Sequence, residues 1–137
     1  MSADVVLLNS GGSNYTSLQA AFERLGARCG QSADPARIRA ASHVVLPGVG
    51  SAASAMQAIA ENSLSDVIRS LQQPLLGICL GMQVLFERSS ESDIDCLGVI
   101  PGTVTRLPAS PGIRVPHMGW NAVSSCREHA LLDGLDG

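Results

Sequence analysis

The sequence predicts an α/β fold in which helices cover both faces of an open, mostly parallel sheet. Short apolar runs alternate with longer segments whose apolar residues recur every three or four positions, a pattern typical of a strand followed by a helix. Glycines and prolines mark the turns between these segments. The chain has 137 residues, of which 45% are hydrophobic. This is enough for one core, so we expect a single domain over residues 1–137.

The first third of the chain predicts three strands and two helical segments. In order, these are a strand over residues 5–8, a helix with Leu18, Ala21, Phe22 and Leu25 on one face that stops at Gly26, a strand over residues 27–31, a short helical segment opened by Asp34 and Pro35, and a strand over residues 43–46 closed by Pro47. The polar residues 9–14 match neither a Walker loop nor a dinucleotide fingerprint. We therefore interpret them as a plain turn from strand to helix.

A second glycine-rich loop, over residues 47–51, follows the third strand. Its two glycines allow backbone N–H groups to approach a ligand, and ligands bind at the carboxyl ends of parallel strands. Taken alone, however, the loop is interpreted by default as a simple connection. Ser51 is expected to cap an Ala-rich helix over residues 52–61. A further apolar stripe follows, formed by Leu64, Val67, Ile68 and Leu71.

Residues 74–86 predict a strand, a tight turn and a helix, with Cys79 at the junction. Pro74 precedes an apolar strand over residues 75–78, and four-residue spacings of apolar side chains predict a helix over residues 80–86. Glycines two positions before and after Cys79 permit the sharp backbone turn of a nucleophile elbow, which exposes the thiol. At a helix N-terminus, backbone N–H groups favour the thiolate and can hold an oxyanion. A small buried core cysteine remains the alternative.

After residue 86 the helical pattern stops. The acidic residues 87–95 indicate a solvated surface loop. Beyond them, frequent prolines and glycines predict short extended segments over residues 103–107 and 113–115 and a short strand over residues 121–123. We expect these pieces to form antiparallel or irregular structure at the edge of the sheet.

Composition excludes several classes of function. The net charge is −3 and the nine basic residues are all arginines without a clustered run, so we expect neither nucleic acid nor a membrane as partner. Neither a signal peptide nor a membrane-spanning run is visible, which predicts a cytoplasmic protein. The cysteines Cys29, Cys79, Cys96 and Cys126 form no CxxC pair. This argues against a metal site and a disulfide framework, and we expect no cofactor.

Three segments together resemble a known family. They are the loop Pro47-Gly48-Val49-Gly50, the elbow Gly77-Ile78-Cys79-Leu80-Gly81-Met82-Gln83, and the segment Pro116-His117-Met118-Gly119-Trp120-Asn121. In order and spacing they resemble the glutaminase subunit of imidazole glycerol phosphate synthase, a class I glutamine amidotransferase with a flavodoxin-like fold. The elbow alone indicates the class, whereas the third segment narrows the resemblance to histidine biosynthesis.

The resemblance implies specific roles. Cys79 would be the nucleophile that attacks the glutamine amide, and the backbone of Val49, Gly50 and Leu80 would form the oxyanion hole. Gly50 and Gln83 would contact the substrate glutamine. The family passes ammonia to a barrel-shaped cyclase subunit, which implies a heterodimer with that cyclase. Asn14 and Ser17 match polar positions of the family's first loop near the partner, although Asn9 and Ser13 replace an Asp and a Gly usual there.

The chain departs from the family in its catalytic histidine. The family completes its triad with a His and, two residues later, a Glu, but no His-x-Glu occurs in these 137 residues. We therefore expect the fold to be incomplete at the C-terminus and this chain alone to be inactive. His117 is interpreted as structural or interface-forming. Two alternatives stay open, namely a non-catalytic binding or scaffold subunit of the same fold, and another hydrolase that uses an elbow cysteine.

Overall fold

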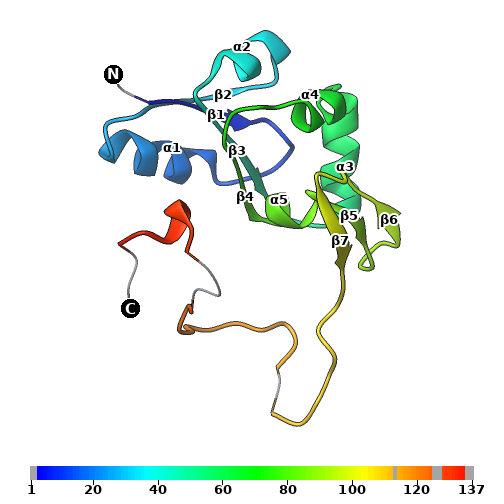
Figure 1. The fold of residues 1–137 in the computed structure, drawn as a ribbon. Helices are drawn as coiled ribbons and strands as arrows, with labels where there is room; N and C mark the ends of the chain where they lie inside the picture. The colour runs from blue at the N-terminus through cyan, green and yellow to red at the C-terminus, as the bar shows by residue number, and fades with distance from the viewer. Residues whose placement is uncertain (1–2, 113, 125–127, 135–137) are drawn as a thin grey trace. The chain divides into compact units, whose positions relative to one another are not determined.

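A computed structural model describes residues 3–112, 114–124 and 128–134. The chain falls into two compact units, Met1–Arg106 and Leu107–Gly137 (Figure 1). Both sheets and the cysteine junction lie in the first unit. The single domain expected for residues 1–137 stays a prediction.

The first unit is built on a four-stranded parallel sheet with the strand order β2-β1-β3-β4. Its strands are β1 (Asp4–Leu8), β2 (Arg28–Ser32), β3 (His43–Gly48) and β4 (Leu75–Cys79). Val6 of β1 is paired with Gly30 of β2 on one side and with Val44 of β3 on the other. Helical segments connect these strands, as parallel pairing requires. The predicted open parallel sheet is therefore confirmed.

Helices cover both faces of this sheet, as predicted (Figure 1). One face packs against α2 (Pro35–Ala40), α3 (Ala52–Glu61) and α4 (Ser65–Arg69), and the other against α1 (Tyr15–Arg24). Alternate residues of a strand point to opposite faces, so β1 contributes Val6 and Leu8 to the first core and Val5 and Leu7 to the second. On the α1 face, Ile78 of β4 is only partly buried, which leaves room for a pocket near the end of the strand.

The start of α3 agrees with the sequence because a local side-chain cap fixes it. Ser51 Oγ accepts a hydrogen bond from the Ser54 N–H (3.2 Å), and Ser54 Oγ accepts one from the Ser51 N–H (3.3 Å). This capping box satisfies N–H groups that have no partner inside the helix. The helix therefore begins at Ala52, directly after the glycine-rich loop.

The end of α1 differs from the prediction at Leu25. This residue was expected on the buried face of the helix, but it is the C-cap and its side chain is 82% exposed. The reason is that the chain already turns here, since the Gly26 N–H donates back to the Glu23 carbonyl at 2.9 Å. Gly26 itself is the stop that the sequence predicts.

The prediction that Pro47 closes the third strand is wrong, because β3 continues through it to Gly48. The Val44 N–H donates towards β4, to the Pro74 carbonyl. Hydrogen-bonding direction alternates from one residue to the next along a strand, so the nitrogen of Pro47, three residues later, faces the β1 side. At that point the pairing between β1 and β3 has already ended, since its last pair is Leu7 with Val45. Its missing N–H therefore costs no ladder hydrogen bond.

The helix predicted over residues 80–86 is shorter in the structure, where α5 covers Leu80–Gln83. The carbonyl groups of Val84, Leu85 and Phe86 instead accept hydrogen bonds from backbone N–H groups of residues 97–100. Phe86 is moreover paired with Ile100 in a sheet, and this extended backbone cannot continue a helix. Pairing with a distant segment therefore ends the helix.

That pairing belongs to a second sheet with the order β6-β5-β7. Its strands are β5 (Phe86–Ser89), β6 (Ile94–Asp95) and β7 (Ile100–Val104). The prediction of a solvated loop over residues 87–95 is wrong for both of its ends. Two of the acidic residues that indicated a loop form ion pairs with Arg88, Asp93 at 2.7 Å and Asp95 at 2.8 Å, and both carboxylates stay exposed.

The described part of the second unit is irregular apart from a 3₁₀ helix, Ala130–Leu132. The extended segment predicted over residues 113–115 begins at Ile113, which lies outside the described residues, and residues 114–115 form no strand. Residues 121–123 form no strand either. Of the segment predicted over residues 103–107, only its first two residues extend, as the end of β7.

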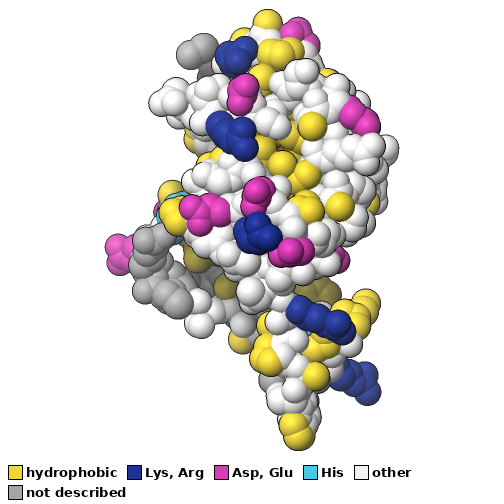
Figure 2. Space-filling view, turned by 90° about the vertical axis from the view of Figure 1, so that its right-hand side faces the viewer, with side chains coloured by type: hydrophobic (Ala, Val, Ile, Leu, Met, Phe, Trp, Pro, Cys, Tyr) yellow, Lys and Arg dark blue, Asp and Glu magenta, His cyan; other side chains and the backbone are white. Residues whose placement is uncertain are grey.

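The surface carries mixed charge. Figure 2 shows arginine and acidic side chains close together on the face it presents. Within the described ranges, no helix has the length and apolar character needed to cross a membrane.

We predict that Gly81→Ala destabilises the first unit strongly. A Cβ at position 81 would overlap the Leu46 carbonyl oxygen and lie 2.7 Å from the Leu46 carbonyl carbon. Since neither backbone can retreat without breaking the sheet, we expect a loss of about 3 kcal/mol, at the upper end of overpacking effects. Urea denaturation followed by circular dichroism measures the change.

Gly30→Ala is the matched control, because a Cβ at that strand position meets no atom within 4 Å. Its effect should stay within about 1 kcal/mol. Equal midpoints for the two variants would contradict the prediction.

Candidate active site at the ends of β3 and β4

Cys79 ends β4 and is followed at once by α5. Its backbone has φ +54° and ψ −117°, a conformation that residues with a Cβ seldom adopt. Strain of this kind costs on the order of 1–3 kcal/mol and is concentrated at functional sites. The predicted sharp turn is therefore present. Because Cys79 is exposed, the alternative of a buried core cysteine is wrong.

Glycines allow this turn to lie directly against the neighbouring strand. A Cβ on Gly77 would lie 2.6 Å from Met82 Cα, inside the turn itself. A Cβ on Gly48 would lie 2.8 Å from the Gly81 nitrogen. Gly48 is also the register partner of Cys79. The two glycine-containing motifs that the sequence singles out are therefore in backbone contact.

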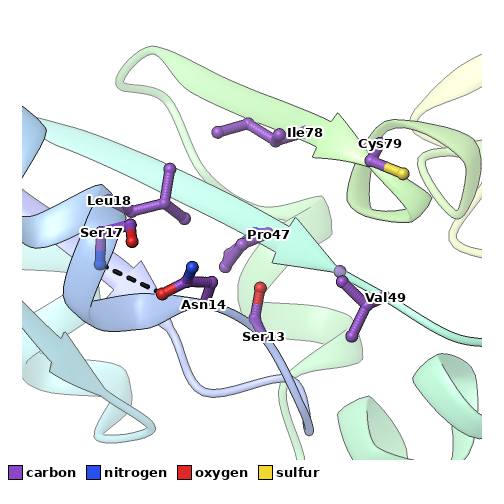
Figure 3. A pocket seen from close by; sticks show the side chains of 9 residues that line it. Ser13, Asn14, Ser17, Leu18, Pro47, Val49, Ile78 and Cys79 are labelled. Atoms are coloured by element: carbon purple, nitrogen blue, oxygen red, sulfur yellow. Dashed lines mark hydrogen bonds between the residues drawn. The ribbon is translucent and has the colours of Figure 1, made fainter.

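A pocket of about 270 Å³ opens beside Cys79. Figure 3 shows that two parts of the chain form its wall, the ends of β3 and β4 and, facing them, the first turn of α1 with the loop before it. Its polar groups are the thiol and the side chains of Ser13, Asn14 and Ser17, and its apolar ones come from Leu18, Pro47, Val49 and Ile78. The pocket is thus a mainly apolar hollow that contains one thiol, a composition typical of small-molecule sites.

The predicted site residues are divided between the pocket and its support. Cys79 and Val49 line it, whereas Gly50, Leu80 and Gln83 do not. The Leu80 side chain is 3% exposed and anchors the start of α5 in the core. Its N–H is in the first helical turn, where donors have no partner inside the helix. Gly50 has φ +95°, and Gln83, the last residue of α5, is half-buried.

Contacts on both sides hold the loop of residues 47–50, hereafter the Pro47–Gly50 loop. Before it, Ser10 Oγ donates a buried 2.8 Å hydrogen bond to the Pro47 carbonyl. After it, the capping box fixes Ser51, and the Glu91 carboxylate accepts from the Ala52 N–H at 3.2 Å. Sequence reasoning missed Ser10 and Glu91, because nothing local distinguishes them from other polar loop residues.

The other described cysteines are poor nucleophiles by comparison. Burial raises the pKa of Cys29, and the charges of Glu23 and Asp4 add to this. Burial likewise raises the pKa of Cys96, with a contribution from Asp95. A raised pKa lowers the thiolate fraction at neutral pH. Cys126 lies outside the described residues.

The three histidines have separate settings. In the first unit, His43 Nδ1 lies 3.0 Å from Ser42 Oγ. In the second unit, Asn121 Nδ2 lies 2.8 Å from His117 Nε2, and His129 Nδ1 accepts from the Leu131 N–H. Among the described residues, no group of three or more His, Cys, Asp or Glu side chains could hold a metal ion.

Comparison with known families identifies a match over nearly the whole chain. The family model described as "Glutamine amidotransferase class-I" matches residues 6–136. A solved structure described as "Crystal structure of glutamine amidotransferase" superposes with a TM-score of 0.64 at 21% identity, covering 74% of this chain and 56% of that one. At this identity the superposition supports the fold alone.

Curated relatives are more similar in sequence. Over 132 residues the chain is 50% identical to the imidazole glycerol phosphate synthase subunit HisH of Xanthomonas euvesicatoria pv. vesicatoria (strain 85-10). It is 49% identical to subunit HisH 2 of Legionella pneumophila (strain Lens). Each match covers 96% of this chain and 66% of the relative, so the chain spans just under two thirds of their length.

We predict that Cys79 reacts faster than the other described thiols with a glutamine-mimicking alkylator at pH 7. Exposure favours Cys79, while the raised pKa values of Cys29 and Cys96 reduce their thiolate fractions, about tenfold for each pKa unit. Mass mapping after brief labelling in a Cys126→Ser background measures the three rates.

The difference in labelling rate should persist up to about pH 9, because the raised pKa values of Cys29 and Cys96 keep these two thiols largely protonated there. Denatured chain, in which all three cysteines should label alike, is the control. Preferential labelling of Cys96 in the folded chain would contradict the assignment.

Proposed function

The chain belongs to the class-I glutamine amidotransferase family, and on this premise we propose that it carries the nucleophile of a glutaminase that supplies ammonia for imidazole glycerol phosphate synthesis. One observation above all supports this. The exposed Cys79 stands at positive φ between β4 and α5, in register with Gly48 of the Pro47–Gly50 loop. A nucleophile beside a loop of backbone donors is the arrangement that acyl transfer needs.

In the proposed reaction, the Cys79 thiolate attacks the amide carbon of glutamine and the carbonyl oxygen becomes an oxyanion. The C–N bond then breaks, and the nitrogen leaves as ammonia after taking up a proton, which produces a thioester. Water attacks the thioester through a second oxyanion. Glutamate leaves with the oxygen of the water, and the sulfur leaves as the thiolate. The net reaction turns glutamine and water into glutamate and ammonium, with the two protons of the water passing to the nitrogen, and it needs no cofactor.

The backbone N–H groups of Leu80, Val49 and Gly50 are the proposed donors to both oxyanions. Leu80 is suited to this because its buried side chain holds the first turn of α5 in place. A donor that is fixed before the reaction costs no reorganisation when charge develops, and one such donor is worth about 10²–10³ in rate. Gln83 and Gly50 are the proposed contacts for the rest of the glutamine molecule.

The proposed partner is a cyclase subunit that receives the ammonia in a heterodimer. The names of the two HisH relatives support it, because both are subunits of imidazole glycerol phosphate synthase. We further propose a cytoplasmic location, as expected from the sequence.

A scaffold that binds glutamine without hydrolysing it stays the alternative. It would require that Cys79 lacks a base and that the departing nitrogen lacks a proton donor.

We predict that the 137-residue chain releases glutamate slowly, and that joining it to the C-terminal segment of a HisH relative, which supplies a His-x-Glu pair, raises the rate by about 10²–10⁴. This is the range that positioned acid and base groups contribute. Glutamate release is measured with and without the cyclase partner.

Cys79→Ala in each form is the control and should abolish the release. If the unextended chain is as fast as the extended one and Cys79→Ala still abolishes it, a residue already in the chain is the base, and His117 becomes the first candidate. If Cys79→Ala leaves the extended form active, the glutaminase assignment itself is overturned.

A further inference from the structure

Ser10 is a polar residue buried next to the candidate site without being part of its pocket. Ser10 comes shortly after the end of β1 and is only 5% exposed. Its Oγ donates a hydrogen bond of 2.8 Å to the Pro47 carbonyl. Among the described residues, the buried polar ones are Ser10 and Ser89. A hydroxyl kept in such a place needs a reason, because an apolar side chain would be easier to bury.

The backbone of Ser10 is itself held in position. The Ser10 N–H donates to the Tyr15 hydroxyl (3.2 Å), which donates to the Gly11 carbonyl (3.0 Å). Tyr15 packs against the core on the α1 face. The same turn lies close to α3, since a Cβ on Gly11 would be 3.1 Å from Ala58 Cβ. The donor to Pro47 is therefore part of a rigid turn.

This contact fixes the direction of one peptide plane. Proline has no N–H, so its carbonyl is the one hydrogen-bonding group that Pro47 offers. Because the trans peptide is planar, holding the carbonyl towards Ser10 turns the Gly48 N–H the opposite way, towards the β4 side where Cys79 is its register partner. At the far end, Ser51 and Ala52 are held as described above.

Between these two anchors lie only Gly48, Val49 and Gly50. Two of the three are glycines, whose backbone would otherwise sample many conformations. An oxyanion donor is effective only when it points at the developing charge beforehand. The anchors therefore decide how well the Val49 and Gly50 N–H groups are oriented.

We propose that Ser10 is a positioning residue for the oxyanion hole, acting through the Pro47 carbonyl rather than by touching substrate. This rests on the proposed function for the effect on chemistry, but the effect on the loop is independent of it. Losing the hydroxyl releases the first anchor. The transition state should then be less stable, so the maximal rate should fall, while the affinity for substrate should change little.

The test uses the 137-residue chain and the chloromethyl ketone analogue of L-glutamine. Attack of the Cys79 thiolate at the ketone produces an oxyanion, and the sulfur forms a stable S–C bond as chloride leaves. No acid is needed, because no ammonia departs in this reaction. Iodoacetamide alkylates the same sulfur without an oxyanion. Ser70→Ala is the matched control, since it removes a serine hydroxyl that donates to a backbone carbonyl, Val67, at the end of α4.

For Ser10→Ala, we expect the maximal inactivation rate by the ketone to fall about tenfold, less than the 10²–10³ for loss of a donor itself. The ketone concentration that gives half-maximal inactivation should stay within about twofold, and the rate with iodoacetamide should not change. Ser70→Ala should react like the unmodified chain with both reagents. Ser10→Thr, which keeps the hydroxyl, should restore the rate. If Ser10→Ala does not fold, Ser10→Cys, with its weaker donor, should give an intermediate rate. Equal ketone rates in all variants would overturn the proposal.

Hydrogen exchange of peptides covering residues 48–52 separates the two hypotheses. Faster exchange in Ser10→Ala, but not in Ser70→Ala, supports the anchoring role, and unchanged exchange overturns it. If the unmodified chain does not distinguish the L from the D ketone, the proposed function fails. Exchange then decides the role of Ser10 by itself.

Discussion

The candidate site depends on the close contact between the first turn of α5 and the end of β3. Gly81 lies against the Leu46 carbonyl, and Gly48 lies against the Gly81 nitrogen, so neither position has room for a side chain. This contact brings the backbone after Cys79 and the Pro47–Gly50 loop together. A site that uses main-chain donors needs such an approach, because N–H groups reach a common point only where backbones meet.

The same contact accounts for how a strained residue is tolerated. Positive φ at Cys79 costs on the order of 1–3 kcal/mol, whereas full burial of a single leucine side chain contributes about 1.5–3 kcal/mol. Leu80, Val84 and Leu85 are all buried immediately after the turn. The favourable term is therefore the larger one, and the strained turn is fixed by the packing of the segment that follows it.

Local patterns in the sequence sufficed for the parallel sheet, for α3 and for the turn at Cys79. Short apolar runs, apolar residues that recur every three or four positions, the Ser51 cap and the glycines around Cys79 each act over a few residues. Their consequences are the same in almost any surrounding structure. The resemblance to the glutaminase family also indicated a set of site residues. They are Cys79, Val49, Gly50, Leu80 and Gln83, and their proposed roles rest on this resemblance together with the geometry.

Only the tertiary structure decided features that depend on distant partners. The short α5 follows from the pairing of Phe86 with Ile100, the position of Pro47 inside β3 from the end of the β1 pairing, and the proposed role of Ser10 from a hydrogen bond to a residue 37 positions away. In each case the local pattern is compatible with more than one outcome. The sequence by itself determined the strands and helices of the parallel sheet and the turn at Cys79. Long-range hydrogen bonds decided the end of α5, the second sheet and the end of β3, because local apolar spacing carries no information about distant partners.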